Sequence, residues 1–483
     1  MKDSRRDFIK KSAMGAGGFA IGANNLIPAE KNQPESRNLL DQVFKKLSDL
    51  GNENCHIWSP ETSLKPFCRL ALSQEDVDFI IESNNIAGCH GGWEIVCEDI
   101  IPKKSYCFKA TAIMEGIPNP VENISAEIYF FSGNPSKPVD WSFVEVKSLN
   151  NSEVFFFQSF VIPENTDLLV IRLLLRWTAT GSVRFSRLSL SESKIKTPVK
   201  MNLAVGSGWK PGDTLQKNLN ICMEVIRKAA KKGADYILLP EVILSSGVPG
   251  SSVEHARPIP GFETDQIAAC ARENKIGVAL TMNEANGTLV HNTGLIFDKQ
   301  DNIVLKYRKV HLAVGERWSG TTPGNQYPFT DVPGGRMGMQ ICYDNVHPEG
   351  IRALALQGVQ IVLLPIMGDP RSWSFDKTDK NKLKWDEDKW YKIMSMRALD
   401  NHVWFVVAAN DGRGSCIINP AGEIITSKSS GDEILFAEVD SSYRNMTSKI
   451  GSSHYNRYWR ERRPSTYSAL NDTNFRTEPF LVT

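Results

Sequence analysis

The sequence lacks an excess of charge of either sign. Its 483 residues carry 56 basic and 55 acidic side chains, a formal net charge of +1 at pH 7. Proteins that bind nucleic acids or anionic membranes concentrate positive charge, so we expect neither partner. The apolar stretch near the N-terminus is too short and too rich in glycine to span a membrane comfortably, and no other segment is apolar enough to cross a bilayer. The content of 41% hydrophobic and 23% charged residues is that of a soluble globular protein.

Motifs for metal binding and for a serine nucleophile are also missing. The nine cysteines form no Cys-x-x-Cys pair and no Cys/His spacing of a zinc site, so no metal or other cofactor is expected. No Gly-x-Ser-x-Gly string is present, which excludes a nucleophile elbow of that kind. Cys416 follows Gly-Ser as in papain-like enzymes, but Ile417 stands where an aromatic is needed, so Cys416 is read as strand core. His347 is read as a loop histidine.

Residues 1–30 have the pattern of a targeting segment. The string Ser-Arg-Arg-Asp-Phe-Ile-Lys at 4–10 precedes a short Gly/Ala-rich apolar stretch at 13–23. It resembles a bacterial twin-arginine export signal, which implies an exported, periplasmic or cell-envelope protein. No clear Ala-x-Ala site follows, so cleavage and retention as an anchor both stay open. An odd number of cysteines in an exported chain indicates an unpaired, reactive thiol.

After a linker and helical segment at 31–54, residues 55–193 have a β texture. Short apolar runs are separated by Pro, Gly and Asn clusters, which predicts an antiparallel sandwich or jelly roll. The clearest runs are Ser125–Phe131, Glu153–Val161, Leu168–Leu175 and Ser182–Leu190.

Two strings in this region resemble carbohydrate-binding-module-like jelly rolls. They are Gly91-Gly-Trp-Glu94 near its start and Gly181–Ser189 at its end. Trp93 and Trp177 are therefore candidate platforms for stacking on a sugar, so a carbohydrate is a possible partner. For each of them, a tryptophan buried in the core is favoured over a sugar platform.

Residues 200–445 alternate between helix and apolar strand. Thr214 to Lys232 has apolar residues at alternating steps of four and three, which predicts an amphipathic helix capped by Asp213 or Thr214 and ended by Gly233. A strand at Tyr236–Leu239 follows, and the same pattern recurs at Gly358–Pro365. This alternation predicts a layered α/β domain, with residues 446–483 as a C-terminal tail.

Three strings in this domain deliver a reactive side chain at the end of an apolar run. They present Glu241 after Leu-Leu-Pro, Lys309 in Tyr-Arg-Lys-Val-His-Leu, and Cys342 in Gln-Ile-Cys-Tyr-Asp. Each alone has a structural alternative, but together they supply a nucleophile, a base and a cation for an oxyanion. A free thiol has a pKa near 8.5, so Cys342 needs Glu241 to take its proton.

In this order the strings resemble the Glu–Lys–Cys triad of the nitrilase superfamily. Similar features accompany them at Asn292-Thr293, Gly315-Glu316, Arg397–Asn401, Val406–Asn410 and Ile417–Glu423. The resemblance implies a four-layer αββα sandwich with Glu241, Lys309 and Cys342 as catalytic residues. Glu316 matches the position of a second glutamate that orients substrate or water.

The resemblance also implies a function for the chain. The expected reaction is hydrolysis of a non-peptide amide bond through a cysteine thioester, with a small-molecule amide as substrate. Tyr343-Asp344 follows the nucleophile in place of the Trp-Glu of true nitrilases, which favours amides; an N-carbamoyl amidohydrolase or nitrilase is the alternative. A homodimer or higher homo-oligomer is expected. A non-catalytic binding protein that uses the jelly roll is the alternative of another class.

Overall fold

The structure is a computed structural model of the whole chain. It describes residues 38–41, 44, 55–72, 76–133, 138–150, 152–194, 199–208, 210–376, 379, 382–428, 434–442 and 461–471. The expected signal at 1–30 lies outside them, as does most of the segment at 31–54. Within the described ranges, no helix is both long and apolar enough to span a membrane.

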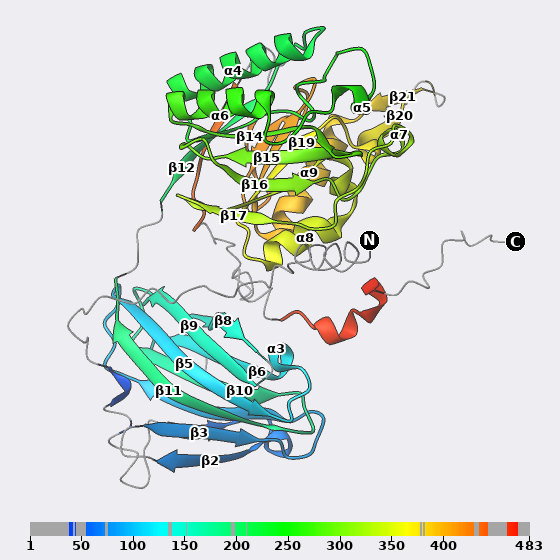
Figure 1. Cartoon of the computed structure of the whole chain (residues 1–483). Helices are drawn as coiled ribbons and strands as arrows, with labels where there is room; N and C mark the ends of the chain where they lie inside the picture. The colour runs from blue at the N-terminus through cyan, green and yellow to red at the C-terminus, as the bar shows by residue number, and fades with distance from the viewer. Residues whose placement is uncertain are drawn as a thin grey trace, which may run out of the picture. The chain divides into compact units, whose positions relative to one another are not determined.

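The chain divides into two compact units (Figure 1). The first comprises residues up to 118, 128–139 and 144–195. The second comprises 119–127, 140–143 and the residues from 196 onward.

Two sheets with antiparallel strand pairs form the β structure before residue 193. The five-stranded sheet has the order β1 (Cys55–Trp58), β4 (His90–Cys97), β10 (Leu168–Arg176), β6 (Ile124–Phe131) and β7 (Asp140–Phe143). The six-stranded sheet has the order β2 (Phe67–Leu72), β3 (Val77–Glu82), β11 (Ser182–Glu192), β5 (Ser105–Glu115), β9 (Glu153–Val161) and β8 (Val146–Leu149). Strands β6, β9, β10 and β11 lie where the apolar runs predict them.

The two candidate sugar platforms of this region lie in different environments. Trp93 is only 7% exposed, and its Nε1 donates a hydrogen bond to the carbonyl oxygen of Ile80 at 3.3 Å. Its ring packs edge-on against Phe79 of the other sheet, with 5.6 Å between the ring centroids. The expectation that Trp93 stacks on a sugar is therefore wrong, because its ring fills the core between the sheets. Trp177 is 42% exposed.

The second unit contains two six-stranded mixed sheets. One has the order β16 (Ile303–Arg308), β15 (Leu289–Phe297), β14 (Gly277–Asn286), β13 (Tyr236–Leu238), β12 (Met201–Gly206) and β25 (Ile434–Val439). The other has the order β17 (Phe329–Val332), β18 (Gly335–Met339), β19 (Ile361–Ile366), β22 (Trp404–Ala409), β23 (Cys416–Ile418) and β24 (Ile424–Ser427). Strands β12–β13–β14 and β18–β19–β22 are parallel.

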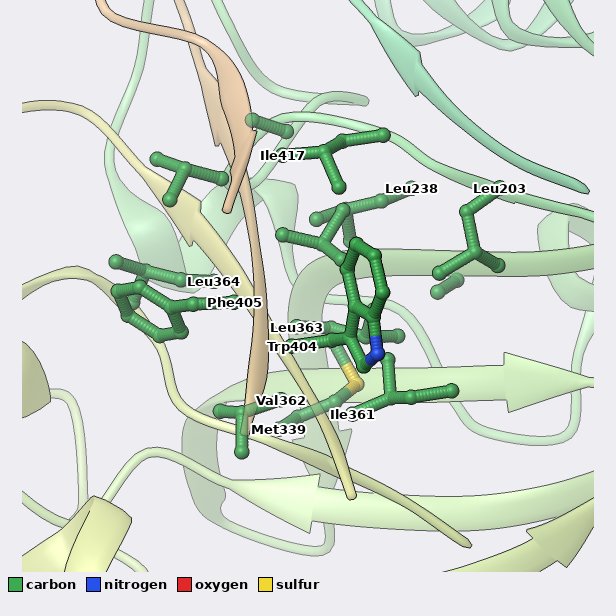
Figure 2. Packing of buried hydrophobic residues seen from close by; sticks show 14 of the residues in the cluster. Leu203, Leu238, Met339, Ile361, Val362, Leu363, Leu364, Trp404, Phe405 and Ile417 are labelled. Atoms are coloured by element: carbon green, nitrogen blue, oxygen red, sulfur yellow. The ribbon is translucent and has the colours of Figure 1, made fainter. Parts of the chain in front are cut away.

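The faces of these two sheets pack against each other through apolar side chains. Leu203 and Leu238 of the first sheet belong to the same buried cluster as Leu363 and Trp404 of the second (Figure 2). Because neighbouring residues of a strand point to opposite faces, Ile237 instead joins a separate cluster under the outer helices.

Helices cover the outer face of each sheet. Helices α4 (Leu215–Lys231) and α6 (Phe262–Asn274) pack on the first sheet (Figure 1), and α8 (Pro348–Leu356) and α9 (Glu387–Asn401) pack on the second. The second unit is thus a mixed α/β fold in which two sheets lie between two pairs of helices. Thr214 caps α4 by accepting a hydrogen bond from the amide of Lys217, as its sequence predicts.

Three strand ends bring the predicted site residues to one side of the second unit. Glu241 follows the end of β13, Lys309 directly follows β16, and Cys342 comes three residues after β18. Strand ends are where chain segments diverge while the sheet holds their start rigidly, so they are common positions for active sites.

Candidate active site

The structure brings the predicted carboxylate, ammonium and thiol together. The Nζ of Lys309 lies 2.9 Å from Oε1 of Glu241, and both side chains are almost completely buried. Burial and the carboxylate of Glu241 raise the pKa of the Cys342 thiol, and the ammonium of Lys309 lowers it, so both charged groups act on the sulfur. These groups come from three separate chain segments.

Glu316 completes the cluster from the short helix α7 (Val314–Trp318). Its Oε2 lies 2.7 Å from Nζ of Lys309 and accepts a hydrogen bond from the backbone amide of Ala313 at 2.8 Å. Asn292 of β15 contacts both glutamates, because its Nδ2 donates to Oε1 of Glu241 and to Oε1 of Glu316 at 2.9 Å each. One ammonium therefore bridges two carboxylates.

Cys342 opens a tight 3₁₀ turn, Cys342–Val346, with a backbone φ of +47°. Non-glycine residues rarely adopt this left-handed conformation, which is found more often at functional sites than elsewhere. The sulfur is mostly buried and lies 3.6 Å from the carbonyl oxygen of Gly368. Burial, and then the negative charge of Glu241, raise the pKa of the Cys342 thiol, against the opposing effect of Lys309. Cys342 therefore rests as a thiol on which a carboxylate acts.

The side chain of Lys309 stays protonated although it is buried. Burial alone would lower the pKa of this ammonium, but the negative charges of Glu241 and Glu316 raise it well above its ordinary value. Lys309 therefore remains a cation and does not serve as a proton acceptor at neutral pH. Its chemical role is electrostatic.

Two contacts to these residues were not foreseen from the sequence. The backbone amide of Met367, just after β19, donates to Oε2 of Glu241 at 3.0 Å. Val242, the next residue after Glu241, has a φ of +40°, and its amide donates to Oγ1 of Thr281 at 2.6 Å. The glutamate is thus fixed both at its carboxylate and at its backbone.

The structural role of Asp344 was not predicted either, although this residue ends the Gln-Ile-Cys-Tyr-Asp string that contains Cys342. Its fully buried carboxylate accepts hydrogen bonds from the backbone amide of Ile341 at 2.9 Å and the hydroxyl of Tyr307 at 2.6 Å. It also accepts from the backbone amide of His311 at 2.8 Å, with Nδ1 of that histidine 3.0 Å away. One carboxylate therefore binds the segments on either side of Lys309 and the residue that precedes Cys342.

Two other residues, Cys416 and His347, were interpreted as non-catalytic, and the structure agrees with this interpretation. Cys416 is completely buried in β23. His347 stacks on His311, with 3.9 Å between the ring centroids, and burial lowers its pKa. All nine cysteines are free. The part of the chain that the structure describes contains no group of three or more His, Cys, Asp or Glu side chains able to hold a metal ion.

The fold and the site define a class of protein: a layered α/β hydrolase that gathers a buried thiol, two carboxylates and a fixed cation. Comparison with family profiles matches residues 205–447 to the carbon-nitrogen hydrolases. The chain belongs to this family. It is an enzyme that hydrolyses carbon–nitrogen bonds other than peptide bonds.

Curated proteins and solved structures include related chains. An omega-amidase NIT2-A of Xenopus laevis is 29% identical over 246 residues, which cover 47% of this chain and 84% of the relative. A deaminated glutathione amidase of Escherichia coli O157:H7 is 28% identical over 246 residues, which cover 49% and 87%. A crystal structure of an amidase from Nesterenkonia sp. aligns with a TM-score of 0.44 at 20% identity, and covers 57% of this chain and 98% of the amidase.

Proposed function

We propose that Cys342 attacks the carbonyl carbon of a small-molecule amide and that Glu241 accepts the thiol proton. The observation that carries this proposal is the buried carboxylate of Glu241, which binds the ammonium of Lys309 at 2.9 Å and, after burial, is the main cause that raises the pKa of the Cys342 thiol. As the carbon–nitrogen bond breaks, Glu241 returns the proton to the leaving nitrogen, which departs as ammonia or an amine. The acyl group remains on sulfur as a thioester.

The second half of the reaction uses the same groups. Glu241 takes a proton from water, the resulting hydroxide attacks the thioester carbon, and the carbon–sulfur bond breaks to give the acid and the thiol. Lys309 and a backbone amide beside Cys342 stabilise the oxyanion in both halves; a donor of this kind contributes about 3 kcal/mol. Glu316, held by Lys309 at 2.7 Å, orients the substrate or the water.

Amides are favoured over nitriles as the substrate class. Tyr343 and Asp344 follow the nucleophile, in place of the Trp-Glu pair of true nitrilases. The omega-amidase and the deaminated glutathione amidase are both named as amidases, and this chain aligns with most of the length of each. An N-carbamoyl amidohydrolase or a nitrilase is the alternative within the family.

The test is a screen for ammonia release from primary amides such as acetamide and butyramide, carbamoyl-amides and nitriles, with intact mass spectrometry to detect the thioester. Cys342→Ala abolishes release, and Cys68→Ala, which removes a half-buried thiol of the first unit, leaves it unchanged. Release that survives Cys342→Ala removes the nucleophile assignment. A wild-type protein that is inert across the screen favours the non-catalytic binding alternative.

We also propose that the first unit, as a jelly roll, binds a carbohydrate near Trp177. This tryptophan is 42% exposed and has a φ of +53°, a strained conformation for a bulky residue. Its ring lies 5.8 Å from that of His90, which lies 5.6 Å from that of Trp58. Binding on a glycan array is expected to disappear with Trp177→Ala and to persist with Trp318→Ala, an 86% exposed tryptophan of the second unit. A flat array contradicts the proposal.

Export is the third part of the proposed function. The twin-arginine string at 4–10 directs the folded chain across the cytoplasmic membrane of a bacterium to the periplasm or envelope. Replacing Arg5 and Arg6 together by lysine is expected to retain the protein in the cytoplasmic fraction. Unchanged fractionation of that variant contradicts export by this route.

We further propose a homodimer or higher homo-oligomer, an expectation that comes from the family resemblance. Multi-angle light scattering of the purified full chain gives its molar mass in solution. A mass of 53.9 kDa, that of one chain, contradicts the proposal.

A further inference from the structure

One asparagine contacts three of the four residues of the site, two through its side chain and one through its backbone. Asn292 donates from Nδ2 to Oε1 of Glu241 and to Oε1 of Glu316, both at 2.9 Å. Its backbone oxygen accepts a hydrogen bond from the amide of Lys309 at 2.9 Å. The side chain is only 3% exposed, so these hydrogen bonds are shielded from water.

The chemistry of these contacts leaves one orientation for the amide group. Both partners of the Asn292 side chain are carboxylates, which only accept hydrogen bonds when ionised, so the NH₂ end must face them. Each N–H then binds one charged oxygen. Hydrogen bonds to the ionised form of a carboxylate favour that form.

Charge balance explains why a neutral donor is needed here. Glu241 and Glu316 share the single positive charge of Lys309, so the three groups carry a net charge of −1 inside the protein. A second lysine would neutralise the remaining charge and weaken the base. Asn292 adds two N–H donors without adding charge.

We propose that Asn292 is a positioning residue that holds the carboxylate of Glu241 in place beside Cys342, so that the thiol proton passes to this carboxylate. The inference rests on the proposed function of Glu241 as the base. The other groups that face Glu241 are the ammonium of Lys309, the thiol itself and the backbone amide of Met367. Asn292 differs from these groups because it is a neutral side chain that binds both glutamates.

The test measures kcat, KM and the pH profile of ammonia release from the best primary amide of the screen. Asn292→Ala is expected to lower kcat about 10- to 100-fold, the effect of losing a hydrogen bond to a charged group, with a smaller change in KM. The acidic limb of kcat/KM moves to higher pH, because Glu241 loses a donor that favours its ionised form. Asn292→Asp moves the limb further, since it adds a negative charge.

A variant that misfolds would lower activity at every pH and leave the limb where it is. Asn292→Ser, which retains one donor, is therefore measured beside it and is expected to give an intermediate kcat and an intermediate limb. Activities are compared per folded molecule, with melting temperature and circular dichroism as the measure of folding. An unmoved limb in the folded Asp and Ser variants overturns the inference.

The chain provides a matched control on the neighbouring strand. Asn283 of β14 pairs directly with Asn292 in the sheet and is 8% exposed, but its Oδ1 accepts from the hydroxyl of Ser245. Asn283→Ala is expected to keep the wild-type pH profile. Equal profiles for Asn283→Ala and Asn292→Ala overturn the positioning role.

Failure of this inference is distinguishable from failure of the proposed function. If Cys342→Ala is inactive and Asn292→Ala equals the wild type, the nucleophile stands and the role of Asn292 falls. If Cys342→Ala retains activity, the proposed reaction itself falls.

Discussion

The side chain of Asn410, at the end of β22 in one sheet, binds the backbone of Glu241, at the end of β13 in the other. Oδ1 of Asn410 accepts from the amide of Glu241 at 3.1 Å, and its Nδ2 donates to the carbonyl oxygen of the same residue at 2.7 Å. The two residues are 169 positions apart in the chain. The position of the proposed base thus depends on how the two sheets pack.

Replacing Asn410 by alanine is expected to lower both activity and stability. Two hydrogen bonds are lost, which destabilises the fold by about 1–3 kcal/mol, and Glu241 is freed to move away from the thiol. We expect kcat for ammonia release to fall about 10-fold or more, because small displacements of catalytic groups have large effects. Steady-state kinetics and urea unfolding measure the two effects separately.

Asn419 provides the matched control for this experiment. It is 4% exposed and organises the turn after β23, with its Nδ2 donating to Glu423 at 2.7 Å. Asn419→Ala is expected to lower stability by a similar amount and leave kcat per folded molecule unchanged. A parallel loss of kcat in both variants would mean that the loss reflects general destabilisation.

Removal of the charge of Glu241 is expected to make Cys342 easier to ionise while abolishing hydrolysis. The negative charge of Glu241 and its hydrogen bond raise the pKa of the thiol, and Lys309 lowers it. In Glu241→Gln the charge of Lys309 acts on the thiol with less opposition. The pH midpoint for alkylation of Cys342 by iodoacetamide should therefore move to lower pH.

Peptide mapping by mass spectrometry identifies the alkylated cysteine at each pH. Lys309→Met is the opposite control, because loss of the cation should move the midpoint to higher pH. An unchanged midpoint in Glu241→Gln would show that this carboxylate does not face the thiol in solution.

The three reactive residues could be predicted because each follows an apolar run that forms a strand. A strand end limits where the next side chain can lie, so Glu241, Lys309 and Cys342 were expected on one side of the sheets. Asp344 and Asn410 could not be assigned roles in this way. Apart from Ile341, their partners are 33 to 169 positions away in the chain, and only the packing of the sheets brings them together.

The wrong expectation that Trp93 stacks on a sugar has a different cause. The string Gly91-Gly-Trp-Glu94 offers no alternation of apolar and polar residues from which to tell its two faces apart. Successive side chains of a strand point to opposite faces, so a one-residue uncertainty in register reverses the assignment. The sequence favours a buried Trp93 without excluding an exposed one, and the packing against Phe79 of the other sheet decides it.

A buried carboxylate near the site predicts acid sensitivity. Burial alone would raise the pKa of Glu284, but hydrogen bonds from Arg308, Lys306 and Thr293 lower it to about 2. The unfolded value is about 4.3, so this group adds about 3 kcal/mol of stability above that pH. The contribution is lost as pH falls from about 5 to about 2, because the folded carboxylate becomes protonated only there.

Glu284→Gln is expected to be less stable than the wild type at pH 7 and to lose less stability on acidification. Urea unfolding at pH 7, 5 and 3 measures the difference. Glu438→Gln, which removes an exposed partner of Lys200, should retain the wild-type pH dependence. Equal acid slopes for the wild type and Glu284→Gln contradict the assignment.

Asp344 joins the two segments that carry the cation and the nucleophile, so its charge should matter for catalysis. Its carboxylate accepts from Tyr307 and His311, on either side of Lys309, and from the amide of Ile341 just before Cys342. Asp344→Asn keeps the size of the side chain but replaces one acceptor oxygen with an NH₂ group that cannot accept.

We expect kcat for ammonia release to fall about 10- to 100-fold in Asp344→Asn, with a smaller change in KM. The reason is that the ammonium of Lys309 and the sulfur of Cys342 are no longer held in their relative positions. Asp331→Asn removes an exposed partner of Arg336 in the same unit and should leave kcat unchanged. Alkylation of Cys342 by iodoacetamide reports on the thiol independently of any substrate. If Asp344→Asn matches Asp331→Asn in both kcat and alkylation rate, the shared carboxylate does not position the two groups.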